Sequence, residues 1–299
     1  MFKLPPHLTL SLCLSAATVG WPFSGNAQDP NYFAIKRLDW KAPIGSATTL
    51  SITNPLGDVR LRTWSLREVE VIITSQSLQA GQTDVELKSL RRPDALELLV
   101  YHPLGQNFSG RADVGLRVLD SINVNIETRN GYIEAKGLTA HVSAQSQSGD
   151  IFIRAVPSLA AATKSGAIFA IFERVESTAH APPFTLKTHT GEITLHVALP
   201  ANFRIEASTG ASIAVAGPTS ATLSNSPGVG TSRTLLLGDA SQIIRVESAT
   251  GDISIFLDEP QNALRHGSTE PLTQPPAIIS PTPPWRPGAP IMEVPKGRR

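Results

Sequence analysis

Apolar and polar residues alternate along most of the chain, and this alternation is organised around glycines. The phrase is a polar run, a glycine and then an apolar residue, as in SQSGDI at 146–151 and SATGDI at 248–253. An apolar period of two is typical of half-buried β-strands. The aligned glycines are Gly57, Gly131, Gly149, Gly166, Gly191, Gly210 and Gly251.

The positions around each glycine predict a strand, a corner and a second strand. The residues seven and five positions before every glycine are apolar, and the residue two positions after is Val or Ile except after Gly210. Three positions before it stands Asn, Thr or Ser, except at Ala207. Because positions −5 and +2 differ by an odd number, the buried phase changes at the glycine. The chain must turn there, and glycine tolerates the backbone angles that this requires.

Units of about 17–25 residues cannot enclose a core alone, so the sequence predicts an all-β fold in which the rungs stack as a β-solenoid. Equivalent apolar residues would form inner ladders, and the hydroxyls at −3 a second ladder. An antiparallel meander with tight hairpins is the alternative, because Asn130-Gly131 is a favoured hairpin pair. The 41 residues from Gly210 to Gly251 leave room for a degenerate unit around 223–230, and the register is open over 207–243.

Four regions are expected along the chain. Residues 1–27 have Lys3, an apolar core at 8–19 and small residues before position 28, which predicts a secretory signal peptide. Residues 28–120 hold strand-like runs at 69–74, 85–90 and 95–101 and are expected to cap the stack. Residues 121–259 form the main array. Residues 260–299 contain ten prolines and predict an extended, disordered tail.

Composition narrows the classes of partner. The 26 basic and 25 acidic residues give a net charge of +1, which argues against a nucleic-acid binder and a polybasic membrane-surface domain. Cys13 is the only cysteine and falls in the signal segment, so the mature chain has no disulfide and no cysteine-ligated metal. No apolar run is long enough for a transmembrane segment. From the predicted signal peptide we expect export to the periplasm, the cell surface or the medium.

The acids beside the glycines are the main candidates for chemistry. Asp58, Asp150, Glu192 and Asp252 would form a carboxylate row at one corner, for calcium or for attack on a polysaccharide. We favour a solvated structural corner, because calcium β-roll repeats have a denser glycine–aspartate pattern and glycosidases need an acid with a raised pKa. His189, Glu192 and His196 lack the zinc-peptidase spacing and are expected to be surface residues. We expect no catalytic residue, metal or cofactor.

The phrases SQSGDI, THTGEI and SATGDI, each after alternating apolar residues, resemble the bacterial putative adhesin domain over residues 47–258. The resemblance implies exported, right-handed β-helix-like repeats of mostly unassigned function, with no catalytic residue to transfer. Our leading hypothesis is a non-catalytic exported β-solenoid that binds a glycan or protein ligand at the envelope or surface. The alternatives are a periplasmic scaffold or sensor module, and a polysaccharide lyase or hydrolase built on a β-helix.

Overall fold

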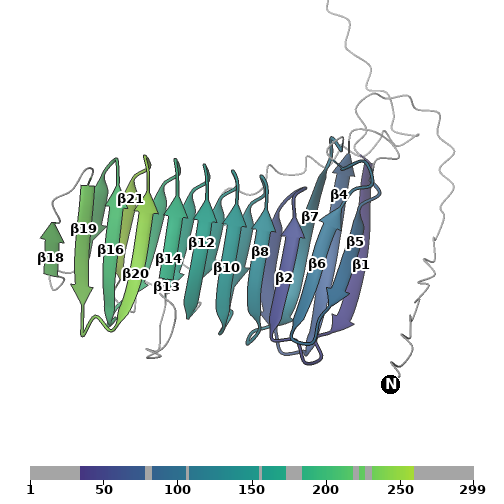
Figure 1. The fold of residues 1–299 in the computed structure, drawn as a ribbon, viewed down its shortest axis with the longest axis horizontal. Helices are drawn as coiled ribbons and strands as arrows, with labels where there is room; N and C mark the ends of the chain where they lie inside the picture. Colours follow the sequence, from purple (N-terminus) through teal and green to yellow (C-terminus); the bar gives the residue numbers. More distant parts are fainter. Residues whose placement is uncertain are drawn as a thin grey trace, which may run out of the picture. The chain divides into compact units, whose positions relative to one another are not determined.

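The chain folds into two large β-sheets (Figure 1). The computed structural model describes residues 34–77, 83–105, 108–154, 157–172, 184–217, 222–225 and 231–258, all of which belong to one compact unit. The predicted signal peptide (1–27) and proline-rich tail (260–299) lie outside the described residues.

Through the middle of the chain, successive strands alternate between the two sheets. The ten-stranded sheet contains, in spatial order, β1 (Ala34–Pro43), β4 (Glu68–Ser77), β7 (Arg111–Leu119), β3 (Val59–Trp64), β9 (Ile133–Lys136), β11 (Ile151–Arg154), β13 (Ile168–Phe172), β15 (Ile193–Ala198), β21 (Ile253–Asp258) and β17 (Ile213–Ala216). The eleven-stranded sheet contains β18 (Thr222–Asn225), β19 (Thr231–Leu237), β16 (Phe203–Thr209), β20 (Gln242–Ser248), β14 (Phe184–Thr188), β12 (Ser158–Thr163), β10 (His141–Ser146), β8 (Asn123–Thr128), β2 (Thr49–Asn54), β6 (Ala95–Tyr101) and β5 (Glu86–Arg91).

The strands before and after the aligned glycines pair in parallel and in register. Val142 on β10 lies opposite Val124 and Leu159, and Ile151 on β11 lies opposite Ile133. In Figure 1, β8, β10, β12 and β14 stand side by side and point the same way. The antiparallel meander is therefore wrong for these strands. The inward side chains of both sheets form one hydrophobic cluster, in which Val142 and Ile193 are completely buried.

The spatial order of the strands differs from their order in the chain at both ends of the sheets. β20 and β21 come last in the sequence but pair between β14 and β16 and between β15 and β17. At the other end, β2 and β3 lie between β6 and β8 and between β7 and β9. The strands β16 and β17 therefore pair with strands that come later in the chain, and β6 and β7 pair with strands that come earlier.

The sixth glycine phrase has a different register from the sequence alignment. The alignment places Phe203 level with Ile244, whereas the structure pairs Phe203 with Gln242 and Ile205 with Ile244. Thr209 consequently lies opposite Ser248, and Ile213 opposite Ile253. This corner is one residue shorter than the others, because four positions instead of five separate Thr209 from Ile213. With this shift, Thr209 takes the hydroxyl position and Ile213 takes the apolar position after the corner. The sequence alignment places Ala207 and Ser212 at these two positions.

The expectation of a degenerate repeat unit around 223–230 is also wrong for the residues that the structure describes. β18 and β19 pair antiparallel with each other, and β19 pairs antiparallel with β16, so this segment forms an edge ladder instead of another parallel rung. Residues 226–230 lie outside the described part of the chain.

The N-terminal strands agree with the expected runs. β4, β5 and β6 cover 69–74, 85–90 and 95–101 almost exactly as expected from the alternation. β1, β4 and β5 form antiparallel pairs at one end of the two sheets. That this region caps the array stays a prediction.

Candidate functional site

The corner between the sheets is built around a column of glycines. A Cβ added to Gly131 would overlap the carbonyl oxygen of Gly57, and one added to Gly149 would overlap that of Gly131. The same holds for Gly166, Gly191 and Gly251, each against the glycine of the adjacent rung. Gly210 departs from the column, because its neighbour is the carbonyl of Ala249. The close approach of backbone to backbone explains why side chains are absent here.

The residues at −3 hold this column together from inside. Thr163 Oγ1 accepts a hydrogen bond from Gly166 N (3.1 Å) and donates one to Gly149 O (3.2 Å). Thr188 and Ser248 repeat both bonds with their own glycine and the preceding one. These hydroxyls are buried. The expected ladder therefore runs mainly through the glycine backbone, although Thr128 also donates to Ser146 Oγ at 3.1 Å.

Three of the four acids after the glycines accept a hydrogen bond from a backbone N–H of the next rung. Asp58 Oδ1 accepts from Tyr132 N (2.7 Å), Asp150 Oδ1 from Ala167 N (2.8 Å) and Asp252 Oδ1 from Ser212 N (3.0 Å). Hydrogen bonds from the hydroxyl and backbone of Ser212 hold the pKa of Asp252 below its ordinary value. These carboxylates thus have a structural partner at the corner.

The four acids do not form a continuous row. Pairing of the rungs places Tyr132 between Asp58 and Asp150, and Ala167 between Asp150 and Glu192. Glu192 and Asp252 lie on adjacent rungs. Asp58 is 6% exposed and forms an ion pair with Arg111 at 2.5 Å. Within the described ranges, no group of three or more His, Cys, Asp or Glu side chains is arranged to hold a metal ion.

The two histidines have different environments. His189 is exposed, as expected. His196 is only 8% exposed, so its expected surface position is wrong. Its Nδ1 lies 2.7 Å from Asp258 Oδ2, and its ring stacks on Phe256 with centroids 4.7 Å apart. Phe256 and Asp258 on β21 therefore cover the His196 side chain.

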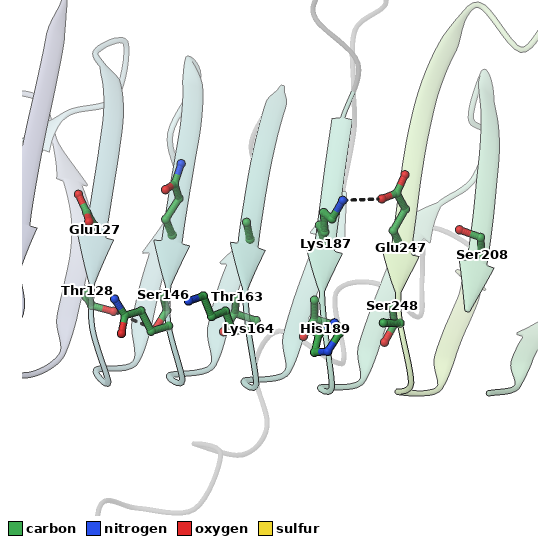
Figure 2. Close-up of a pocket in the computed structure, with 15 residues that line it drawn as sticks. Glu127, Thr128, Ser146, Thr163, Lys164, Lys187, His189, Ser208, Glu247 and Ser248 are labelled. Atoms are coloured by element: carbon green, nitrogen blue, oxygen red, sulfur yellow. Dashed lines mark hydrogen bonds and ion pairs between the residues drawn. The ribbon is translucent and has the colours of Figure 1, made fainter. Parts of the chain in front are cut away.

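An open groove of about 700 Å³ crosses the strands of the eleven-stranded sheet just before the corner (Figure 2). Its first row lies at position −4, where outward side chains on paired strands lie side by side. In spatial order these are Glu127, Gln145, Ala162, Lys187 and Glu247. Ser208 continues the row because it pairs with Glu247, although it lies two positions before Gly210. Neighbouring members of the row are about 4.8 Å apart, the spacing of paired strands.

The second row lies at position −2, where the backbone bends toward the corner. Its lining residues are Gln147, Lys164, His189 and Ala249. Backbone hydrogen bonds fix this row, since Lys164 N donates to Gln147 O and His189 N donates to Lys164 O. The ordered strands therefore present both rows on a rigid support.

Charge in the groove is partly neutralised. Lys187 Nζ and Glu247 Oε2 lie 3.1 Å apart, and Figure 2 shows this pair spanning β14 and β20. Lys164 forms no ion pair with the residues that the structure describes. Such a surface of ammonium, amide and hydroxyl groups can bind a polar ligand through hydrogen bonds and charge.

Apart from His189, the residues of the two rows were not predicted as a site from the sequence, because the apolar ladder and the acids after the glycines gave the stronger pattern. Their signal was present as the polar residues between buried positions of each strand, such as Gln145 between the buried Ala144 and Ser146. These positions face outward because successive side chains of a strand alternate.

Among the residues that the structure describes, no helix is long and apolar enough to span a membrane.

Comparisons with known proteins give matches to solved structures at low identity and with TM-scores below 0.5. No family model and no curated protein matches the sequence. The chain is similar to the solved structure of a putative cell adhesion protein from Clostridium sporogenes, with 12% identity and a TM-score of 0.48 over 75% of this chain and 100% of that one. It is also similar to a putative adhesin from Bacteroides fragilis, with 11% identity and a TM-score of 0.25 over 75% of this chain and 97% of that one.

Proposed function

We propose that this protein is an exported, non-catalytic binding module with an adhesin-like role, whose parallel rungs stack as a β-solenoid. The observation that carries the proposal is the groove, in which outward polar side chains from six paired strands line an open hollow. The signal peptide predicted for residues 1–27 and the family resemblance of the sequence motifs support the proposed export.

The groove suits an elongated ligand. It runs across the strands, so a ligand lying in it would meet side chains from successive rungs at regular intervals of about 4.8 Å. Its strands are already paired on both sides, which leaves no free edge here for an added peptide strand. Recognition must therefore come from side-chain contacts along the ligand.

Two tryptophan substitutions on β12 test this role. Ala162 lines the groove, whereas Ala160 is two positions earlier on the same strand and does not. Beads coated with the full chain are passed over immobilised polysaccharides and matrix proteins, and retained beads are counted. We expect Ala162→Trp to reduce retention about tenfold by filling the groove, and Ala160→Trp to leave it unchanged.

Equal retention of both variants and the parent would show that the groove is not the binding site. Failure of the parent to be retained on any surface would also contradict the adhesin-like role. Circular dichroism and melting temperatures, measured on both variants, identify a loss that comes from unfolding.

A further inference from the structure

The inner row of the groove is basic and continues beyond it. At position −2, the row begins at Arg129 and passes through Gln147 to Lys164 and His189, linked by backbone hydrogen bonds between successive rungs. Arg129 lines a second hollow of about 340 Å³ with Asn130 and Arg111. Arg129, Lys164 and His189 are all exposed. We call these three residues the basic row.

The basic row differs from other charged parts of the surface. Most exposed cations of the described chain have an acidic partner, such as Lys41 with Glu70 (2.7 Å) and Arg92 with Glu97 (2.6 Å). Neither Arg129 nor Lys164 forms an ion pair with any described residue. Their charge is therefore available to a ligand.

The acids around the basic row define where an anion can lie. In the groove, Glu247 is paired with Lys187, and Glu127 stands at one end of the outer row. Asp150, Glu192 and Asp252 come after the corner glycines, on the opposite side of the corner from the basic row. An extended anion is thus attracted to the −2 side and repelled from the +1 side.

The lining also limits the class of polymer. Protein partners usually bury aromatic or aliphatic anchors, but the two rows consist of charged, amide and hydroxyl side chains with alanines. Nucleic acids carry one phosphate per nucleotide and need a larger excess of cations than Arg129, Lys164 and a net charge of +1 provide. A linear polysaccharide with carboxylates at intervals offers both charge and hydroxyl groups.

We infer that the basic row binds a linear acidic polysaccharide of the polyuronate class, with Arg129 and Lys164 contacting carboxylates two rungs apart. This inference rests on the proposed function, since it names the ligand of the same groove. The distance between those two rungs is about 10 Å, or twice the strand spacing.

The test compares two polymers that share a backbone. The full chain is measured by affinity electrophoresis in gels that contain polygalacturonate or its fully methyl-esterified form. We expect binding to the charged polymer to be at least about tenfold tighter, and to weaken between about 50 and 200 mM salt. Combining Arg129→Gln with Lys164→Gln should weaken it about fivefold or more.

The control is Arg67→Gln combined with Lys88→Gln, which removes the same charge from exposed sites outside the groove. Binding of this variant should change less than about twofold. Equal affinity for both polymers, or equal effects of the two double variants, would overturn the inference. So would absence of binding to polygalacturonate. If Ala162→Trp still reduces bead retention about tenfold in any of these cases, the groove function stands and only the ligand class is wrong.

Discussion

Corner glycines are the residues whose identity the packing restricts most. At Gly149 an added Cβ would meet the carbonyl of Gly131, and neither backbone can move away without breaking the parallel pairing. At Gly115, in contrast, the nearest atom to an added Cβ is Ile72 O at 3.8 Å, an ordinary contact.

Gly149→Ala should therefore lower the free energy of unfolding by about 1–3 kcal/mol or more, as overpacking does. Gly115→Ala should change it by less than about 0.5 kcal/mol. Urea unfolding of the two variants measures the difference. Similar stabilities for both would contradict the stacked glycine column.

The buried hydroxyls give a second prediction. Thr163→Val keeps the shape of the side chain but leaves Gly166 N and Gly149 O without their hydroxyl partner. Since an unsatisfied buried polar group costs about 1–3 kcal/mol, the melting temperature should fall. Thr163→Ser retains the hydroxyl and should recover most of the loss. A Val variant as stable as the parent would show that the bridge contributes little.

His141 predicts a pH dependence of stability. Its Nδ1 lies 2.8 Å from Ser158 Oγ, and burial lowers its pKa below the ordinary 6.5. Between the folded pKa and 6.5 the unfolded chain binds more protons, so the free energy of unfolding decreases as pH falls through this window. Above it, this contribution is fully present.

Melting temperatures between about pH 7.5 and 5 should decline more steeply for the parent than for His141→Gln, which has no titrating imidazole. The comparison removes the effect of carboxylates, which both proteins share. Parallel pH profiles would contradict the effect assigned to His141.

At the scale of strands, the same substitution should be far more destabilising on the inward face of β15 than on its outward face. Ile193 is completely buried between Ile168 and Ile253, whereas the next residue, Thr194, faces outward. Ile193→Asp buries an unpaired charge and should abolish cooperative folding, because total stabilities are only about 5–15 kcal/mol. Thr194→Asp should shift the melting temperature by no more than about 2 °C. A cooperative Ile193→Asp variant of normal stability would refute the inner ladder.

The alternation and the glycine spacing were sufficient to predict these strands and their faces. Leu50, Val124 and Val142 align by simple counting from Gly57, Gly131 and Gly149, and the structure pairs them directly. Local pattern succeeds here because each rung repeats the same burial and the same corner.

Other features depend on long-range pairing that the pattern does not encode. The strand that ends at Thr209 pairs two residues away from its aligned register, and β20 pairs with β14 although the two strands are far apart in the sequence. Likewise, the burial of His196 comes from Asp258 and Phe256, which are about sixty residues away in sequence. The groove likewise depends on the pairing of the strands, because residues from Glu127 to Ala249 line it together.

For the whole molecule, the proposed role requires that the groove meet ligands outside the cell. The chain is nearly neutral, with a net charge of +1, so its binding should depend on particular side chains more than on net charge. An adhesin-like protein and a periplasmic scaffold would share the same strands and differ in location.

Protease shaving of intact cells that carry an epitope-tagged copy measures that location directly, with a periplasmic protein as control. We predict that the tagged protein is cleaved while the periplasmic control survives. Protection of both until the envelope is opened would contradict the adhesin-like role and indicate a periplasmic partner.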